Sequence, residues 1–361
     1  MLLVNFHGGS GGVNNVYGYS TKNGQLETKS ALGGLPKHVK LDELRAMAVY
    51  NGNLYVASGA KNDSAILVFA GPPKPGPEFD YLDVVIGGCQ SIMHPFALAF
   101  DLASPHFYVS NQDSNVVVRL KVKAGKHGAV TGTLGKGCQS RYLTGLYPPP
   151  AAFLDGTFVA SQVGELAGVT VKNIPNVSAA NGGLGVTMVK GKPLQPANSV
   201  RDTAVANDIL FVCDEVDSRV NMYNLSSTIE TLTLGTFLGS GTHMKNPTHL
   251  AVHGGGLWVS AEDKLYWSAL PGSPSGATLS FSSIAITVPA NHKVGGISFD
   301  NSNHVYVIFQ EGTHETGTGS ISKYAVSAGS PPALSSAETF ATIKEDTPEF
   351  CLWVSDSHWH S

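Results

Sequence analysis

The stretch Phe107-Tyr108-Val109-Ser110-Asn111-Gln112 carries a pattern that returns along the chain: an aromatic residue, then valine, then small or polar residues. The apolar run Val116-Val117-Val118 follows it. Five other stretches repeat the pattern, namely Leu54 to Ser58, Thr157 to Ser161, Leu210 to Asp214, Leu257 to Ala261 and Val305 to Phe309. Runs rich in β-branched and aromatic residues indicate β-strands, so the sequence predicts one strand copied many times.

The spacing of these copies indicates the architecture. Their aromatic residues are separated by 53, 50, 53, 47 and 48 residues, counting through Tyr55, Tyr108, Phe158, Phe211, Trp258 and Tyr306. Each copy, here called the anchor strand, follows an apolar stretch of small and large residues and precedes a third apolar stretch. Gly, Asn and Asp fill the connections, as in β-hairpins. Such a period is typical of a four-stranded β-propeller blade, whose crowded first strand, here called the axial strand, suits small residues.

The two chain ends supply the remaining copy. Leu2 to Phe6 and Val16 to Tyr19 match an anchor strand and a third strand, and Pro348 to Trp353 matches an axial strand. We therefore predict one all-β domain over residues 1–361, a seven-bladed β-propeller of four-stranded antiparallel blades in which the N- and C-terminal strands share one blade. Six blades is the fallback. The expected blades are 27–90, 91–139, 140–195, 196–243, 244–290, 291–345, and 346–361 together with 1–26.

Composition limits the partners that we expect. Hydrophobic residues make up 42% of the chain and charged residues only 14%, against about a quarter in ordinary domains. The net charge of −4 argues against a nucleic-acid partner, which would require a basic face. The sequence has no run of about 18 apolar residues, so no membrane-spanning helix is expected. We expect a small organic substrate and a monomer or weak oligomer.

Three glycosylation sequons begin at Asn62, Asn176 and Asn224, and the composition is poor in charged residues. We therefore expect a secreted glycoprotein whose leader has been removed, because Met1 to His7 is too short and too polar to be one.

The four cysteines fall into two groups. Cys89 and Cys138 lie in a repeated Gly-Cys-Gln-Ser phrase and could form a disulfide if their Cα atoms lie within about 7 Å. Cys213 and Cys351 lie inside apolar strands and are expected to be buried thiols.

The repeat resembles the YVTN/NHL class of β-propellers, in Tyr108-Val109-Ser110-Asn111 and in the stretch from His94-Pro95-Phe96 to Asp101. The resemblance covers nearly the whole chain. Propellers of this kind include virginiamycin B lyase-like enzymes, lactonases, cyclases of fungal biosynthetic pathways and proteins that only bind. The resemblance implies the fold and leaves the reaction open, because one fold hosts many functions.

The candidate site follows from the strand ends. In a propeller, the residue after each anchor strand and the residue that opens each axial strand lie on one face of the ring. The anchor-strand exits are Gly59, Gln112, Gln162, Glu215, Glu262, Gln310 and His7. The axial-strand entries are Arg45, Phe96, Pro149, Arg201, Thr248, Gly295 and Glu349. Polar groups that converge on one opening predict a ligand site; the alternative is that strand ends are polar because they meet water.

We assign roles by residue chemistry. His7, Glu215 and Glu262 are the predicted acid–base catalysts, because gathered carboxylates raise one another's pKa and a neutral histidine can act as a base. Arg45 and Arg201 would orient the substrate or stabilise developing negative charge. The other predicted substrate-binding residues are Phe96, Asn111, Gln112, Gln162, Thr248, Gln310, Glu349 and His94.

No cofactor is expected, although carboxylates together with Asn111 could bind Ca²⁺. The sequence contains no Gly-x-Ser-x-Gly, P-loop or Rossmann motif, so serine-nucleophile hydrolysis and nucleotide chemistry are not expected. The first hypothesis is a cofactor-independent lyase, isomerase or cyclase, including cyclisation or cycloaddition in natural-product biosynthesis. The first alternative is a non-catalytic propeller that binds a ligand or glycan, and the second is a Ca-dependent lactonase-type hydrolase.

Overall fold

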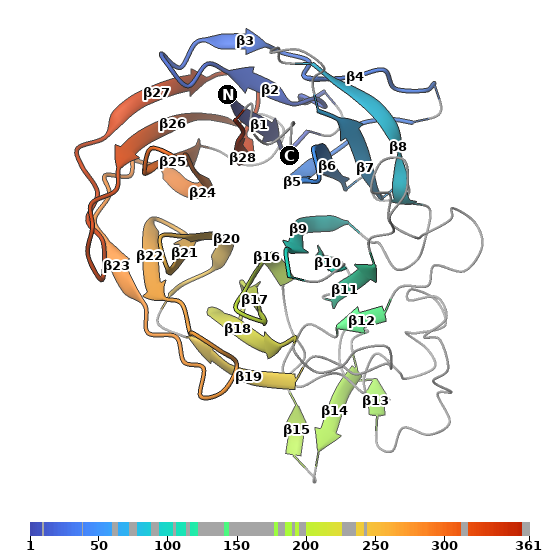
Figure 1. The fold of residues 1–361 in the computed structure, drawn as a ribbon, viewed down its shortest axis with the longest axis vertical. Helices are drawn as coiled ribbons and strands as arrows, with labels where there is room; N and C mark the ends of the chain where they lie inside the picture. The colour runs from blue at the N-terminus through green and yellow to red at the C-terminus, as the bar shows by residue number, and fades with distance from the viewer. Residues whose placement is uncertain are drawn as a thin grey trace.

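The structure, a computed structural model, describes most of the chain. The described residues are 1–8, 11–37, 39–59, 64–71, 78–87, 94–103, 106–112, 116–121, 141–143, 177–179, 185–189, 192–194, 200–225, 236–241, 244–311 and 317–355. Every helix or strand within these ranges is a β-strand (Figure 1), which confirms the all-β class. In the same ranges, no helix is long and apolar enough to cross a membrane.

The sheets stand around a common axis, and their first strands form a closed ring (Figure 1). These axial strands contact one another in cyclic order, the last contacting the first again. They are β5 (Leu44–Tyr50), β9 (Pro95–Asp101), β16 (Val200–Ala206), β20 (Pro247–His253), β24 (His292–Phe299) and β28 (Pro348–Trp353). The chain is a β-propeller.

Each sheet continues outward from its axial strand in antiparallel order. The anchor strands come next: β6 (Asn53–Ser58), β10 (His106–Asn111), β17 (Ile209–Asp214), β21 (Gly256–Ala261) and β25 (His304–Glu311). The third strands are β7 (Ala65–Ala70), β11 (Val116–Lys121), β18 (Arg219–Asn224), β22 (Lys264–Ala269) and β26 (Thr318–Ala325). The outer strands are β8 (Phe79–Gly87), β12 (Arg141–Leu143), β19 (Thr236–Gly241), β23 (Ser282–Ile284) and β27 (Glu338–Ile343), and the short β4 (Leu32–Gly33) pairs in parallel with β8.

The chain ends share one sheet, as the sequence predicts. Strand β1 (Leu2–Phe6) lies between β28 and β2 (Tyr17–Tyr19), with β3 (Leu26–Thr28) outside. The fully buried Asn5 fastens this closure, because its side-chain oxygen accepts a hydrogen bond from the Phe350 amide at 2.9 Å and its Nδ2 donates to the Arg45 carbonyl. The side-chain amide of Asn5 therefore joins β1 to β28, which carries Phe350, and to β5, which carries Arg45.

The repeated aromatic residues form the contacts between neighbouring sheets. Tyr55, Tyr108, Phe211, Trp258 and Tyr306 are each at most 1% exposed. Each of them belongs to an anchor strand, and burying such a side chain contributes on the order of 2 to 3 kcal/mol. The repeat that indicated the fold is therefore the repeat that stabilises it.

The described residues do not confirm seven blades. Strand β9 packs directly against β16, so the two neighbour each other in the ring. Within the predicted blade 140–195, β12 is the outer strand of the β9 sheet, and a separate sheet consists of β13 (Val177–Ala179), β14 (Gly185–Val189) and β15 (Lys192–Leu194). The predicted anchor strand at 157–161 lies outside the described residues. The count of seven is therefore not confirmed.

Cys213 and Cys351 are buried free thiols, as expected, and burial raises the pKa of both. Cys89 and Cys138 lie outside the described residues, as do the sequons at Asn62 and Asn176. The disulfide and the glycosylation therefore stay predictions.

Candidate functional site

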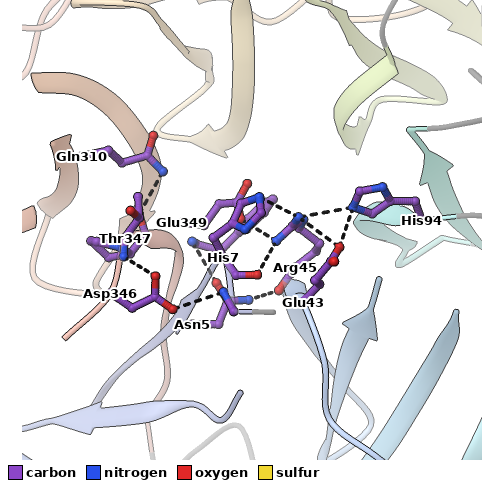
Figure 2. A network of polar contacts seen from close by, with 12 residues as sticks. Asn5, His7, Glu43, Arg45, His94, Gln310, Asp346, Thr347 and Glu349 are labelled. Carbon is purple, nitrogen blue, oxygen red and sulfur yellow. Dashed lines mark hydrogen bonds and ion pairs between the residues drawn. The ribbon is translucent and has the colours of Figure 1, made fainter. Parts of the chain in front are cut away.

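The buried side chain of Arg45 is the centre of a polar network at one mouth of the ring (Figure 2). Arg45 is 2% exposed and lies near the start of β5. Its Nη1 donates to Glu349 Oε2 at 2.7 Å and to the His7 carbonyl at 3.1 Å. Its Nη2 lies 3.2 Å from Nε2 of both His7 and His94. Since a guanidinium only donates, Nε2 is the acceptor in each of these two contacts.

Glu43 and His94 enter this network because of their backbone conformation. Their φ angles are +45° and +49°, in the left-handed region that non-glycine residues seldom adopt. Each precedes an axial strand, and each carbonyl accepts an amide from beyond the neighbouring anchor strand, Glu43 from Gly59 and His94 from Gln112, both at 3.0 Å. His94 Nε2 lies 3.3 Å from Glu43 Oε2. Sequence reasoning selected His94 and missed Glu43, although both stand two residues before an axial-strand entry.

Glu349 balances the charge of Arg45. Burial acts to raise the pKa of Glu349, but Arg45, with smaller contributions from His7, His249 and Arg201, outweighs it and holds the pKa below the usual value. The pair is therefore a buried ion pair that joins β5 to β28. Gly296 lets β24 approach the same strand, because a Cβ there would lie 2.7 Å from the Glu349 carbonyl oxygen.

A second guanidinium lies at the start of β16. Arg201 donates from Nε and Nη2 to Glu215 Oε2 at 2.8 and 2.6 Å. Its Cζ lies 5.3 Å from the centre of the Phe96 ring, a distance at which a cation attracts an aromatic face. Its buried Nη1 has no hydrogen-bond partner among the described residues. Arg201 therefore retains a donor that its protein partners do not use.

An aromatic layer lies beside the two arginines. Phe96, His249 and Phe350 come from three axial strands, and their ring centres are 4.5 to 5.7 Å apart. His249 is 3% exposed, and burial lowers its pKa to about 4, so its imidazole is neutral at pH 7. This layer closes part of the axis with apolar surface.

The predicted acid–base pair of Glu215 and Glu262 is not supported by the geometry. Glu215 is held by Arg201, whereas Glu262 binds Lys245 at 2.8 Å and the Asn246 side-chain amide at 2.8 Å. Each carboxylate therefore has its own donor partner. Of the three predicted catalysts, His7 is the one that the structure places in the Arg45 network.

Several predicted binding residues hold strand ends instead. Gln310 Nε2 donates to the Pro348 carbonyl at 2.8 Å, and Thr248 Oγ1 donates to the Ser260 carbonyl at 3.5 Å. Asn111 is fully buried within β10, and Gln162 lies outside the described residues. Asp346, which sequence reasoning missed, accepts amides of the N-terminal loop, including that of Val13 at 2.8 Å. These contacts are those that polar residues make when strands end in a protein interior.

In the described part of the chain, no group of three or more His, Cys, Asp or Glu side chains is arranged to hold a metal ion. The Ca²⁺ hypothesis stays a prediction.

The comparisons with known proteins support the fold. No family model matches the sequence, and no curated protein matches it. Among solved structures, a Pseudomonas aeruginosa periplasmic gluconolactonase matches with a TM-score of 0.55 and 12% identity, covering 98% of each chain. A putative 6-phosphogluconolactonase from Bacteroides fragilis matches at 0.52 and 13%, covering 98% of this chain and 97% of that one.

A third solved structure, a nidogen/laminin complex, matches with a TM-score of 0.53 and 9% identity over 97% of each chain. Two of these neighbours are named for lactone chemistry and one for a protein complex. At such identities the likeness shows the β-propeller fold alone.

Proposed function

We propose that this protein is a small-molecule hydrolase of the lactonase type, which opens a cyclic ester at the Arg45 mouth. The observation that carries the proposal is that two guanidinium groups, of Arg45 and Arg201, lie near the same buried Glu349, with Arg45 Nη2 3.2 Å from Nε2 of both His7 and His94. Hydrolysis of a lactone needs a base for water and a positive group for the oxyanion, and both are present. The names of the neighbouring lactonase structures favour the same reaction.

His94 is the base in this proposal. Its side chain is 17% exposed, so a ligand at the mouth can reach it, whereas that of Arg45 is 2% exposed. As water attacks the lactone carbonyl carbon, Nε2 of His94 gives up its contact with Arg45 Nη2 and takes the proton of the water. The Glu43 carboxylate, 3.3 Å from that nitrogen, stabilises the resulting imidazolium. The ring C–O bond then breaks and the ring oxygen takes the proton, which leaves a hydroxy acid.

Arg201 stabilises the oxyanion. Its Nη1 has no hydrogen-bond partner in the described chain, and Glu215 and Phe96 fix its other atoms. Arg45 is a positioning residue, because it contacts His94 Nε2 and is itself only 2% exposed, and His7 acts through Arg45, which it contacts at 3.2 Å. A donor fixed before the reaction costs no reorganisation during it, which is the usual source of oxyanion stabilisation.

The test is turnover of a series of five- and six-membered lactones, followed as acid release above the spontaneous rate. We expect His94→Gln and Arg201→Gln to lower kcat by about 10²-fold each. Glu262→Gln, whose carboxylate binds Lys245 instead, is the matched control and should keep full activity. The assay is repeated with added Ca²⁺ and with a chelator, because the Ca-dependent form of the hypothesis requires activity to follow the metal.

A non-catalytic ligand-binding propeller is the second candidate. The observation that favours it is that both arginines are already paired, Arg45 with Glu349 and Arg201 with Glu215. If no lactone is turned over above the spontaneous rate while lactones or hydroxy acids still bind, hydrolysis is wrong and binding is the function. If the protein rearranges a ligand without adding water, the result would instead support the lyase, isomerase or cyclase hypothesis.

A further inference from the structure

The axial strands enclose a second space, separate from the arginines. It is a cavity of about 540 Å³, and residues of all the axial strands line it. Along each strand the lining residues follow those of the mouth: Asp202 follows Arg201, Leu250 follows His249, and Phe350 follows Glu349. The cavity also reaches Trp353, the last residue of β28, and Asn303, which lies beyond the end of β24. Its volume lies within the range of roughly 300–1,000 Å³ of small-molecule sites.

The charge of this cavity is one-sided. Asp202 and Asp300 line it, and no lysine or arginine of the described chain does. The carboxylate of Asp300 already has hydrogen-bond partners, because His304 Nδ1 lies 3.0 Å and the Tyr306 hydroxyl 3.2 Å from its Oδ2. Its Oδ1 accepts the amides of Ser302 and His304 at 2.8 and 2.9 Å.

Asp202 is different. It is 8% exposed, and its carboxylate accepts only the backbone amides of Thr203 at 2.7 Å and Leu250 at 2.9 Å among the hydrogen bonds of the described chain. A carboxylate has about four acceptor positions, so about two are left open on the cavity side. Burial without a cation raises the pKa of Asp202 to about 7, despite these two amides. A positive ligand would supply the missing charge.

A second acceptor lies beside it. His249 Nδ1 is buried, has no hydrogen-bond partner among the described residues, and lies 3.9 Å from Asp202 Oδ2. Two acceptors at this separation can both bind one nitrogen at ordinary hydrogen-bond lengths of about 2.8 Å. An ammonium group has three such donors and no acceptor, so it fits the pair.

The walls indicate what the rest of the ligand is. Leu98, Leu250 and Ile297 line the cavity together with Phe350. At the ends of β20 and β24, Phe299 stacks on His253 with ring centres 4.2 Å apart and planes 6° apart. Apolar walls with few polar groups suit an apolar body, and aromatic faces attract a nearby cation.

We propose that this cavity binds a small organic ammonium ion, a primary amine with an aromatic or aliphatic body, whose nitrogen donates to Asp202 and His249. The site adjoins the Arg45 mouth, because His249 and Phe350 belong to the aromatic layer beside the arginines, but it does not depend on lactone hydrolysis there. The apolar body lies against Leu98, Leu250 and Ile297.

A series of ligands of equal shape tests the proposal. Benzylamine, benzyl alcohol and benzoate are titrated into the purified full-length protein by calorimetry at pH 7.5. We expect benzylamine to bind at least about tenfold more tightly than benzyl alcohol, because a hydrogen bond between an ammonium and a carboxylate is stronger than one from a neutral hydroxyl. Benzoate should not bind measurably. Equal affinity for amine and alcohol would overturn the proposal.

Two variants locate the binding. Asp202→Asn removes the charge and should abolish the preference for amine over alcohol, whereas Asp263→Asn, in an exposed turn, should preserve it. If Asp202→Asn does not fold, Ala251→Phe gives an independent test, because Ala251 lines the cavity and its side chain is only partly buried. The larger side chain should prevent binding of amine and alcohol alike. Benzylamine binding unchanged in Ala251→Phe would place the amine elsewhere and refute the proposal.

Discussion

The mouth around Arg45 and Arg201 and the cavity around Asp202, here called the compensated and the uncompensated end, place charge in opposite ways, although the same axial strands build both. At the mouth, Arg45 pairs with Glu349 and Arg201 with Glu215, so each cation has a carboxylate. One residue further along β16, Asp202 has no cation within the described chain and accepts only backbone amides. The comparison shows that a single step along an axial strand separates a compensated site from an uncompensated one. Removing or adding one charge should therefore affect the two ends differently.

The largest expected effect is at the compensated end. Arg45→Gln leaves the buried carboxylate of Glu349 without its cation, which should lower the free energy of unfolding by about 3 to 5 kcal/mol. Urea titration at pH 7 measures the change. Arg201→Gln is the comparison variant and should cost less, because its partner Glu215 has a side chain that is 26% exposed. If the two variants lose the same free energy of unfolding, burial does not decide how much each ion pair stabilises the fold.

The second prediction concerns the pH dependence of stability at the uncompensated end. Burial raises the pKa of Asp202 from 3.8 to about 7, so the folded state holds this proton more tightly and acidification from pH 7 towards 4 stabilises the fold. Burial lowers the pKa of His249 from 6.5 to about 4, so acidification through the same range favours the unfolded state. Between pH 4 and 6.5 the two contributions oppose each other. The free energy of unfolding of the wild type should therefore change little with pH through Asp202 and His249.

Single substitutions separate these contributions. In Asp202→Asn the His249 contribution remains, so the free energy of unfolding should fall by about 3 kcal/mol at most as pH drops from 6.5 to 4.5. In His249→Phe, which keeps an aromatic ring beside Phe96 and Phe350, it should rise over the same range. Urea titrations at four pH values measure both slopes. Slopes of the same sign in the two variants would show that the groups are not buried as described.

Much of the fold could be predicted from the sequence, because the signals are local. The phrase around Tyr108-Val109 repeats where a strand repeats, and the ends Leu2 to Phe6 and Pro348 to Trp353 pair as expected. The number of blades could not be predicted in the same way. A stretch such as Thr157 to Ser161 has the composition of a strand, but it lies outside the described residues, and among the described axial strands β9 packs directly on β16.

The candidate site was predictable in position and not in its pairings. Strand ends indicated the mouth and selected Arg45, Arg201, His7 and His94. Their partners are distant in sequence, as for Arg45 and Glu349, which are 304 residues apart, and no local pattern links such residues. Glu43 was missed because a left-handed backbone turns it inward, and its sequence position alone does not show this.

The third prediction compares two carboxylates of the mouth. Glu215→Gln removes the partner of Arg201 while leaving the guanidinium beside Phe96. The loss of stability should be about 1 kcal/mol, because partly exposed pairs contribute little. Under the proposed hydrolysis, kcat should fall more than KM changes, since Arg201 acts on the oxyanion and is no longer fixed. Measurement of kcat and KM on one lactone checks this. An effect on KM alone would mean that Arg201 contacts the bound substrate and the transition state equally.

The smallest effect is expected at Glu262, which the sequence suggested as a catalyst. Its partner Lys245 has a side chain that is 74% exposed, and solvent and salt screen such a pair. Glu262→Gln should therefore leave the thermal midpoint and the lactone turnover within experimental error of the wild type. The physical reason is that the carboxylate binds Lys245 and Asn246 at the rim, apart from the His94–Arg45 contact. A loss of turnover with normal stability would instead restore Glu262 as an acid–base residue, and would require the mouth to close around a substrate by bringing Glu262 towards Arg201.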